Sequence, residues 1–254
     1  GNLGNAMGSL LVILVLEKLG IEYTPLIVIP GIITALVLLR YAPGKDQIGE
    51  RPMLNLSWER LRNVNRYKLS MLAIIMFMIY SLYIIWITVV SYMPLYYTEK
   101  DVSLINIGNI LLIFGALGGA SGLLSGSLYD RFKRGTIIIQ VAILLAAILL
   151  FFSFRAEGLL SSALFILGGF FLISTQPVCI RMAQDLLPGN MSLASSLILG
   201  FAPGIAGITM IFLGKAADVI GIVSLINYEL LVLALAFILF LIFPFVKKRS
   251  TQHP

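Results

Sequence analysis

One carboxylic acid stands inside a long apolar run of this sequence and is well placed for chemistry. Glu229 lies about 10 Å along a helix from the start of the apolar run at residue 222. An ionisable side chain in such surroundings is costly and usually serves a function. Two interpretations stay open: Glu229 is functional, or it lies near the membrane interface or pairs with Lys215.

A second group of candidates consists of polar and aromatic side chains near the middle of other apolar runs. Tyr80 and Tyr83 share one helical face in the run at 69–93, with Trp86 beside it, while Asn109 and Gln176 lie in later runs. Such side chains line a ligand pocket or pack between helices. For the two tyrosines both interpretations stay open, and for Asn109 the alternative is an interhelical hydrogen bond. We predict that Tyr80, Tyr83 and Gln176 point into one polar cavity.

Other kinds of chemistry find little support in the sequence. Single Ser, Asp and His residues are scattered without the spacing of a nucleophile and its base, so we expect no catalytic residues. His253 is the single histidine and Cys179 the single cysteine, which excludes a histidine metal cluster and an internal disulfide. A phosphate-binding Gly-rich loop is absent, so an ATP-driven pump is not expected. We expect neither a metal nor a cofactor.

The elements that must position these side chains follow from the composition. The chain has 254 residues, of which 59% are hydrophobic and 12% charged, and its mean hydropathy is +0.99. A soluble domain carries about twice that share of charge. We therefore predict an all-α polytopic membrane protein, because lipid offers the backbone no hydrogen-bond partner. About eight transmembrane helices are expected, at 3–16, 24–41, 69–93, 104–128, 135–154, 159–180, 192–214 and 222–246.

The basic residues predict the orientation of these spans. With residue 1 on the inside, Lys and Arg gather in the inner loops, and Lys18, Lys100, Arg155 and Lys215 alone fall outside. This distribution explains the net charge of +6 without nucleic-acid binding. We therefore expect a multi-pass protein of the inner (plasma) membrane with residue 1, the 42–68 loop and the C-terminus in the cytoplasm. That loop contains either an amphipathic surface helix or a flexible linker.

A charged motif joins the fourth and fifth predicted spans. Gly126 precedes Asp130 and Arg131, and Arg134 follows. A tight loop of this kind could lock through its charges and unlock when they part. The motif resembles the signature loop of the major facilitator superfamily, which joins the second and third helices of each six-helix half. The resemblance implies a gating role for these four residues.

The same resemblance implies a division of the chain and a partial facilitator fold. Residues 1–41 would be the last two helices of the N-terminal half, 42–68 the central cytoplasmic loop, 69–246 the six-helix C-terminal half and 247–254 a cytoplasmic tail. The other N-terminal helices would then be missing, so the chain resembles a fragment of a transporter. The spans at 69–93 and 159–180 would line the cavity. Glycines that have lost their packing partners are expected to be exposed around Gly4, Gly8, Gly115, Gly118, Gly119 and Gly122.

A third motif resembles the fosmidomycin resistance branch of that superfamily. Gln184 and Asp185 lead through Pro188 into a Gly-rich helix that ends at Asp218. Pro188 breaks the helix and turns the chain, and Asp185 could bond the start of the next helix. The step from Gly214 to Asp218 also repeats the step from Gly126 to Asp130, as expected for transporter halves.

The resemblance implies proton-coupled efflux of small molecules, such as fosmidomycin-like drugs, by alternating access. Such a protein would be an antiporter and would confer antibiotic resistance. Its partners would be the lipid bilayer, a small-molecule substrate and protons as the coupling ion. A facilitator that carries a sugar or another metabolite is the alternative. A polytopic membrane enzyme or a helical scaffold is less favoured, because neither requires polar side chains at the middle of the spans.

Overall fold

A computed structural model describes residues 8, 11, 12, 14–41 and 66–250, and the part of the chain that it describes is helical, without a strand. The N-terminal part contains a 3₁₀ helix η1 (Ile21–Ile27) and α2 (Val28–Tyr41). The main bundle contains α4 (Arg66–Thr98), α5 (Leu104–Phe132), α6 (Gly135–Ser153), α7 (Gly158–Leu186), η3 (Pro188–Asn190), α8 (Met191–Ser196), η4 (Leu197–Phe201), α9 (Ala202–Ile220) and α10 (Ile222–Ser250).

Seven stretches of the described chain are long and apolar enough to span a membrane. They correspond to seven of the eight predicted spans, and the prediction of an all-α membrane fold is confirmed. The span predicted at 3–16 lies partly outside the described residues, as do the 42–68 loop, with its proposed amphipathic segment, and the end of the tail. Some helices are longer than predicted: α4 has 33 residues, about 50 Å, because its backbone stays helical beyond the apolar run.

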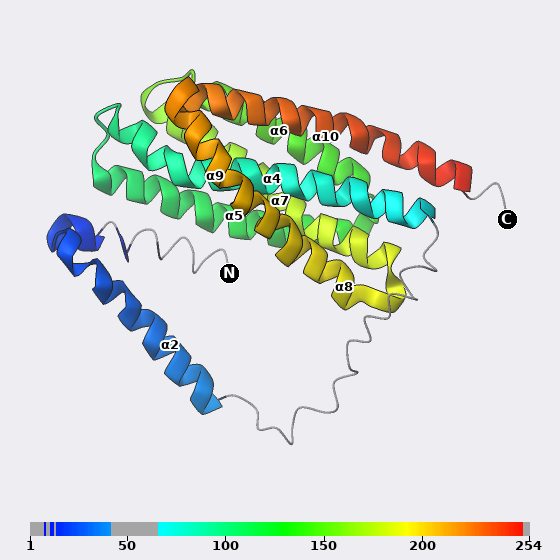
Figure 1. Ribbon diagram of the computed structural model, residues 1–254, viewed down its shortest axis with the longest axis horizontal. Helices are drawn as coiled ribbons and strands as arrows, with labels where there is room; N and C mark the ends of the chain where they lie inside the picture. The colour runs from blue at the N-terminus through cyan, green and yellow to red at the C-terminus, as the bar shows by residue number, and fades with distance from the viewer. Residues whose placement is uncertain (1–7, 9–10, 13, 42–65, 251–254) are drawn as a thin grey trace.

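The helices from α4 to α10 form one bundle, whereas α2 lies apart from it and has no buried residue (Figure 1). The bundle has a continuous apolar core, which includes the fully buried side chains of Ile75, Ile85, Ile143, Phe165 and Phe240. Many large apolar side chains also stay exposed on the outer faces of the spans. Exposure of this kind suits lipid rather than water.

Glycines allow α7 to approach both α5 and α6 closely. A side chain at Gly169 would overlap the Phe114 ring, and one at Gly168 would lie 2.8 Å from Leu150 Cγ. Gly118 is buried against Ile173, so the expectation that this glycine is exposed is wrong. The small residues of α5 serve packing within the bundle because α7 crosses them directly.

The span that follows α7 is irregular in its first half. Pro188 begins η3, α8 then forms a single short helix, and η4 is a π-helical turn that ends two residues before Pro203. Proline lacks the N–H that a regular α-helix needs, and π turns commonly accommodate such breaks. The Gly-rich stretch predicted at 192–214 is therefore one continuous span with a local defect.

Candidate functional site

A hydrogen bond joins two of the predicted polar residues across the bundle. Gln176 Nε2, on α7, donates to the Tyr83 hydroxyl, on α4, at 2.6 Å. Both side chains are half-buried, and Pro177 follows Gln176 directly. An amide and a phenol at this depth satisfy each other while part of their polar surface stays open. The pair can therefore offer one further hydrogen bond to a small molecule.

Tyr80 and Trp86 extend this group along α4. The Tyr80 hydroxyl lies 3.0 Å from Thr209 Oγ1, on α9, and Trp86 meets the Tyr83 ring edge-on at 6.2 Å between centroids. Tyr80, Tyr83, Trp86, Gln176 and Thr209 are called the aromatic–amide cluster below. Sequence reasoning missed Thr209. The available signal was its hydroxyl inside the apolar run at 192–214.

Asn109 lies elsewhere, in a pocket between the start of α7 and the first half of α5. This α5–α7 pocket has a volume of about 860 Å³, and its polar lining includes Lys100, Asn106, Glu157 and Ser162. Asn109 is exposed there. The structure thus places Asn109 in a pocket apart from Tyr83 and Gln176. A helix as long as α5 carries its side chains to widely separated depths.

The turn between α5 and α6 marks one end of the bundle, called the basic end because Arg131, Lys133 and Arg134 lie there. Gly126, Asp130 and Arg131 belong to the last turns of α5, and Arg134 alone stands in the turn that starts α6. The motif is therefore mostly helix rather than loop. Asp130 forms an ion pair with Lys133 at 3.4 Å, and both side chains are exposed. Exposed pairs of this kind contribute about 0–1 kcal/mol.

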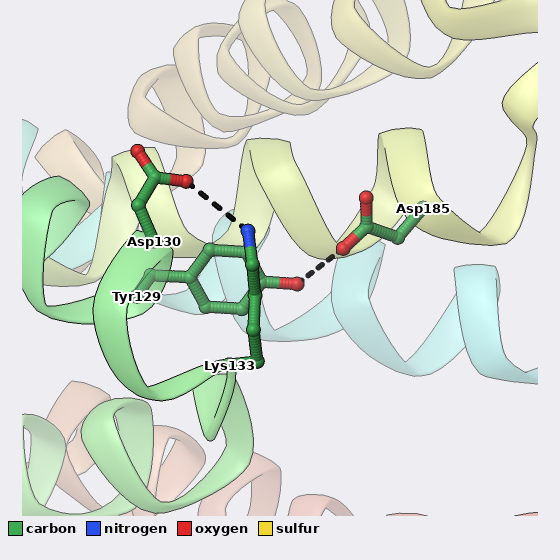
Figure 2. A network of polar contacts seen from close by, with 4 residues as sticks. All are labelled: Tyr129, Asp130, Lys133 and Asp185. Carbon is green, nitrogen blue, oxygen red and sulfur yellow. Dashed lines mark hydrogen bonds and ion pairs between the residues drawn. The ribbon is translucent and has the colours of Figure 1, made fainter.

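Tyr129 makes the stronger contact at the basic end. Its hydroxyl donates to the Asp185 carboxylate on α7, as Figure 2 shows, while Lys133 reaches past the Tyr129 ring toward Asp130. A hydrogen bond to a carboxylate is about twice as strong as one between neutral groups. Tyr129 was missed by sequence reasoning, although it stands inside the motif that begins at Gly126. It links the two motifs that the sequence singled out separately.

The turn after α7 uses Gln184 rather than Asp185 to hold the next helix. Gln184 Nε2 donates to Ser195 Oγ at 2.7 Å across this turn, where Pro188 starts η3. Asp185 bonds Tyr129 instead of the next helix, and neither η3 nor α8 has a side-chain hydrogen bond at its start. Asp218 is exposed near the far end of α9 and does not meet the other three residues of this motif.

Glu229 is buried in the bundle, with 4% of its surface exposed. Thr88 Oγ1, on α4, donates to Glu229 Oε1 at 2.6 Å, and Glu229 Oε2 has no hydrogen-bond partner among the described residues. Lys215 is exposed and forms no described ion pair with it. The interpretation that Glu229 pairs with Lys215 is therefore wrong. Within the described residues, no group of three or more His, Cys, Asp or Glu side chains could hold a metal.

The comparisons with known proteins agree with this architecture. The family model of the Major Facilitator Superfamily matches residues 1–198. The chain belongs to this superfamily. The facilitator chain is also 26% identical over 226 residues to the fosmidomycin resistance protein of Escherichia coli (strain K12). It is 32% identical over 113 residues to the uncharacterized MFS-type transporter YfnC of Bacillus subtilis (strain 168).

These alignments cover unequal shares of the proteins. The match to the fosmidomycin resistance protein covers 86% of this facilitator chain and 54% of that relative. The match to YfnC covers 44% of the chain and 27% of that relative. The chain thus spans about half the length of the first relative. Membership identifies a multi-pass protein of a membrane transport family, whose apolar helices lie in a lipid bilayer.

Proposed function

We propose that the aromatic–amide cluster forms one wall of a substrate cavity in an exporter of small molecules. The observation that carries this proposal is the Tyr83–Gln176 hydrogen bond, because it places two polar groups with spare capacity between α4 and α7. Trp86 beside Tyr83 adds an apolar surface. Small-molecule sites typically combine such surfaces with a few fixed polar groups. The other wall belongs to helices of an N-terminal half.

We further propose that export exchanges a substrate, of the kind that the relative's name suggests, for protons. The sequence similarity to the fosmidomycin resistance protein supports a drug of that kind. Two halves that rock about the site would open it to each side in turn. The Tyr129–Asp185 contact at the basic end would hold α5 and α7 together during this movement. Asp130, Arg131 and Arg134, with Gly126, would act at the gate and not on the substrate.

We place the basic end in the cytoplasm, as the distribution of Lys and Arg favours. The aromatic–amide cluster would then lie near the middle of a plasma (inner) membrane. The domain boundaries follow from the same scheme: residues 42–68 form the central cytoplasmic loop, and residues 69–246 the C-terminal half. The α5–α7 pocket, which contains Asn109, would open toward the outer face.

Transport by the native gene product in inverted membrane vesicles tests this proposal. Uptake of fosmidomycin that rises when the vesicle interior is acidified supports proton-coupled export. Gln176→Leu should weaken substrate affinity, because it removes the amide and keeps the volume. Asn109→Leu, in the separate pocket, is the matched control and should leave affinity unchanged.

Three results would contradict individual parts of the proposal. Equal affinity in wild type and Gln176→Leu would exclude the aromatic–amide cluster as the binding site. Uptake that ignores the pH gradient would exclude proton exchange. Transport of a sugar or another metabolite without any transport of fosmidomycin would favour the alternative within the same superfamily.

A further inference from the structure

Glu229 has an unusual combination of burial and bonding. It lies about 10 Å along α10 from Ile222, it is 4% exposed, and one carboxyl oxygen is left without a partner among the described residues. The other oxygen accepts the Thr88 hydroxyl at 2.6 Å, and the same hydroxyl lies 3.7 Å from Met210 Sδ on α9. Three helices therefore meet at this single carboxyl group.

No described cation compensates the Glu229 carboxyl group. An isolated buried carboxylate is very costly, whereas a neutral carboxylic acid that keeps one hydrogen bond is not. The unpartnered oxygen Oε2 is where a proton can sit. In this arrangement the structure favours the neutral acid, and any movement that admits water or a cation would favour release of its proton.

A pocket lies at the end of the bundle opposite the basic end, one to two helical turns beyond Thr88 on α4 and Glu229 on α10. This α9–α10 pocket has a volume of about 380 Å³ and is lined by Tyr92 on α4, Asp218 on α9 and Ser224 on α10. Tyr92 lies one helical turn, about 6 Å, from Thr88, and Ser224 lies about 7.5 Å along the helix from Glu229. A side chain at Gly214 would lie 3.3 Å from the Tyr92 hydroxyl, so this glycine lets Tyr92 pack closely against α9 beside the pocket.

Six chargeable groups on the neighbouring elements lie between the depth of Glu229 and that end of the bundle. They are Tyr92, Tyr96 and Glu99 on α4, Lys215 and Asp218 on α9, and Arg155 in the turn after α6, which contacts Asn227. Helix α6 itself contains no titratable residue. On α10, the adjacent Tyr228 is exposed. Tyr80 and Tyr83 on α4 are bonded to Thr209 and Gln176 instead.

We propose that Glu229 is a proton-binding site that exchanges protons with the outer side through the α9–α10 pocket. This inference rests on the proposed proton exchange and names the residue that carries the proton. A proton passes from water in the pocket to Glu229 Oε2 and neutralises the carboxylate. It leaves when α4, α9 and α10 shift and expose the group to the other side. Thr88 holds the carboxyl group in position through Oε1.

Infrared difference spectroscopy of the reconstituted native gene product tests the site without any transport measurement. A protonated carboxyl group gives a carbonyl band that titrates away at high pH. Glu229→Gln should abolish this band, whereas Glu157→Gln, which changes an exposed acid outside the site, should keep it. Thr88→Val should shift the band to higher frequency, because the carbonyl loses its hydrogen bond. Glu229→Asp retains a titrating band, and together with Thr88→Val it decides the assignment if Glu229→Gln does not fold.

Transport measurements then connect the site to coupling. Glu229→Gln should lose accumulation driven by a proton gradient and retain exchange of substrate for substrate. A band that persists in Glu229→Gln, or one that does not respond to Thr88→Val, would overturn the assignment. Unchanged proton-driven accumulation in Glu229→Gln would overturn it as well. Wild-type transport that ignores the gradient would instead refute the proposed exchange, while the infrared band still decides whether Glu229 binds a proton.

Discussion

Replacing Gly169 with alanine tests how tightly α7 packs against α5. The new methyl group would overlap the Phe114 ring and would lie 2.7 Å from Phe114 Cζ. This ring cannot move away easily, because it is 3% exposed and stacks on Phe165 at 4.8 Å between centroids. Forcing extra volume into a filled core costs about 1–3 kcal/mol. The variant should therefore be less stable than its helix propensity alone predicts.

Gly122→Ala provides the matched control at the same helix pair. A methyl group at Gly122 would lie 3.5 Å from Pro177 Cγ, which is an ordinary contact. Both substitutions gain about 1 kcal/mol from the higher helix propensity of alanine. This gain cancels in the comparison, so the free energies of unfolding of the two variants should differ by about 1–3 kcal/mol, with Gly169→Ala the less stable.

Denaturant titration in detergent micelles measures both free energies of unfolding. Shortening the opposing side chain with Phe114→Leu should make Gly169→Ala less harmful than it is in the wild-type background, because the two residues share one contact. Equal stability of Gly169→Ala and Gly122→Ala would refute the packing argument. Strict additivity with Phe114→Leu would refute the assigned contact.

Three further predictions concern the polar contacts. Tyr129→Phe should cost about 1.5–3 kcal/mol of unfolding free energy, because the charged Asp185 loses its donor; an unchanged thermal transition would contradict this. Asp130→Asn should lower the turnover of transport and leave equilibrium substrate affinity nearly unchanged, and a large loss of affinity with normal turnover would refute the gating role. Tyr83→Phe and Gln176→Leu should each weaken substrate affinity. The double variant should lose less binding free energy than the sum of the two single losses, because the two residues share one hydrogen bond. Additive losses in binding assays would argue against a joint site.

The individual spans could be predicted from the sequence because lipid imposes a local requirement. Each apolar run must satisfy its own backbone hydrogen bonds, so run length and hydropathy suffice to identify a helix. The helix ends were less predictable. The helix α4 continues to Thr98 although its apolar run was placed at 69–93, and the motif after Gly126 is helical up to Phe132. The backbone stays hydrogen-bonded as a helix beyond the last apolar residues, so hydropathy does not locate the helix end.

The contacts of the candidate site's side chains were also only partly predictable from the sequence. Polarity inside an apolar run singled out Tyr83, Gln176 and Glu229, because such residues are costly in lipid wherever they lie. This local cost does not indicate which residue will be the hydrogen-bond partner. Gln176 meets Tyr83 across 93 positions of the chain, and Asp185 meets Tyr129 across 56.

The sequence by itself thus determined the fold class, the superfamily and which side chains are out of place in an apolar run. The tertiary structure alone decided which of them meet, because the crossing of helices brings distant positions to the same depth. It separated Asn109 from the aromatic–amide cluster and buried Glu229 beside Thr88, 141 positions away, instead of near Lys215. The cost of a buried carboxyl group is local, but the hydroxyl that stabilises it comes from another helix.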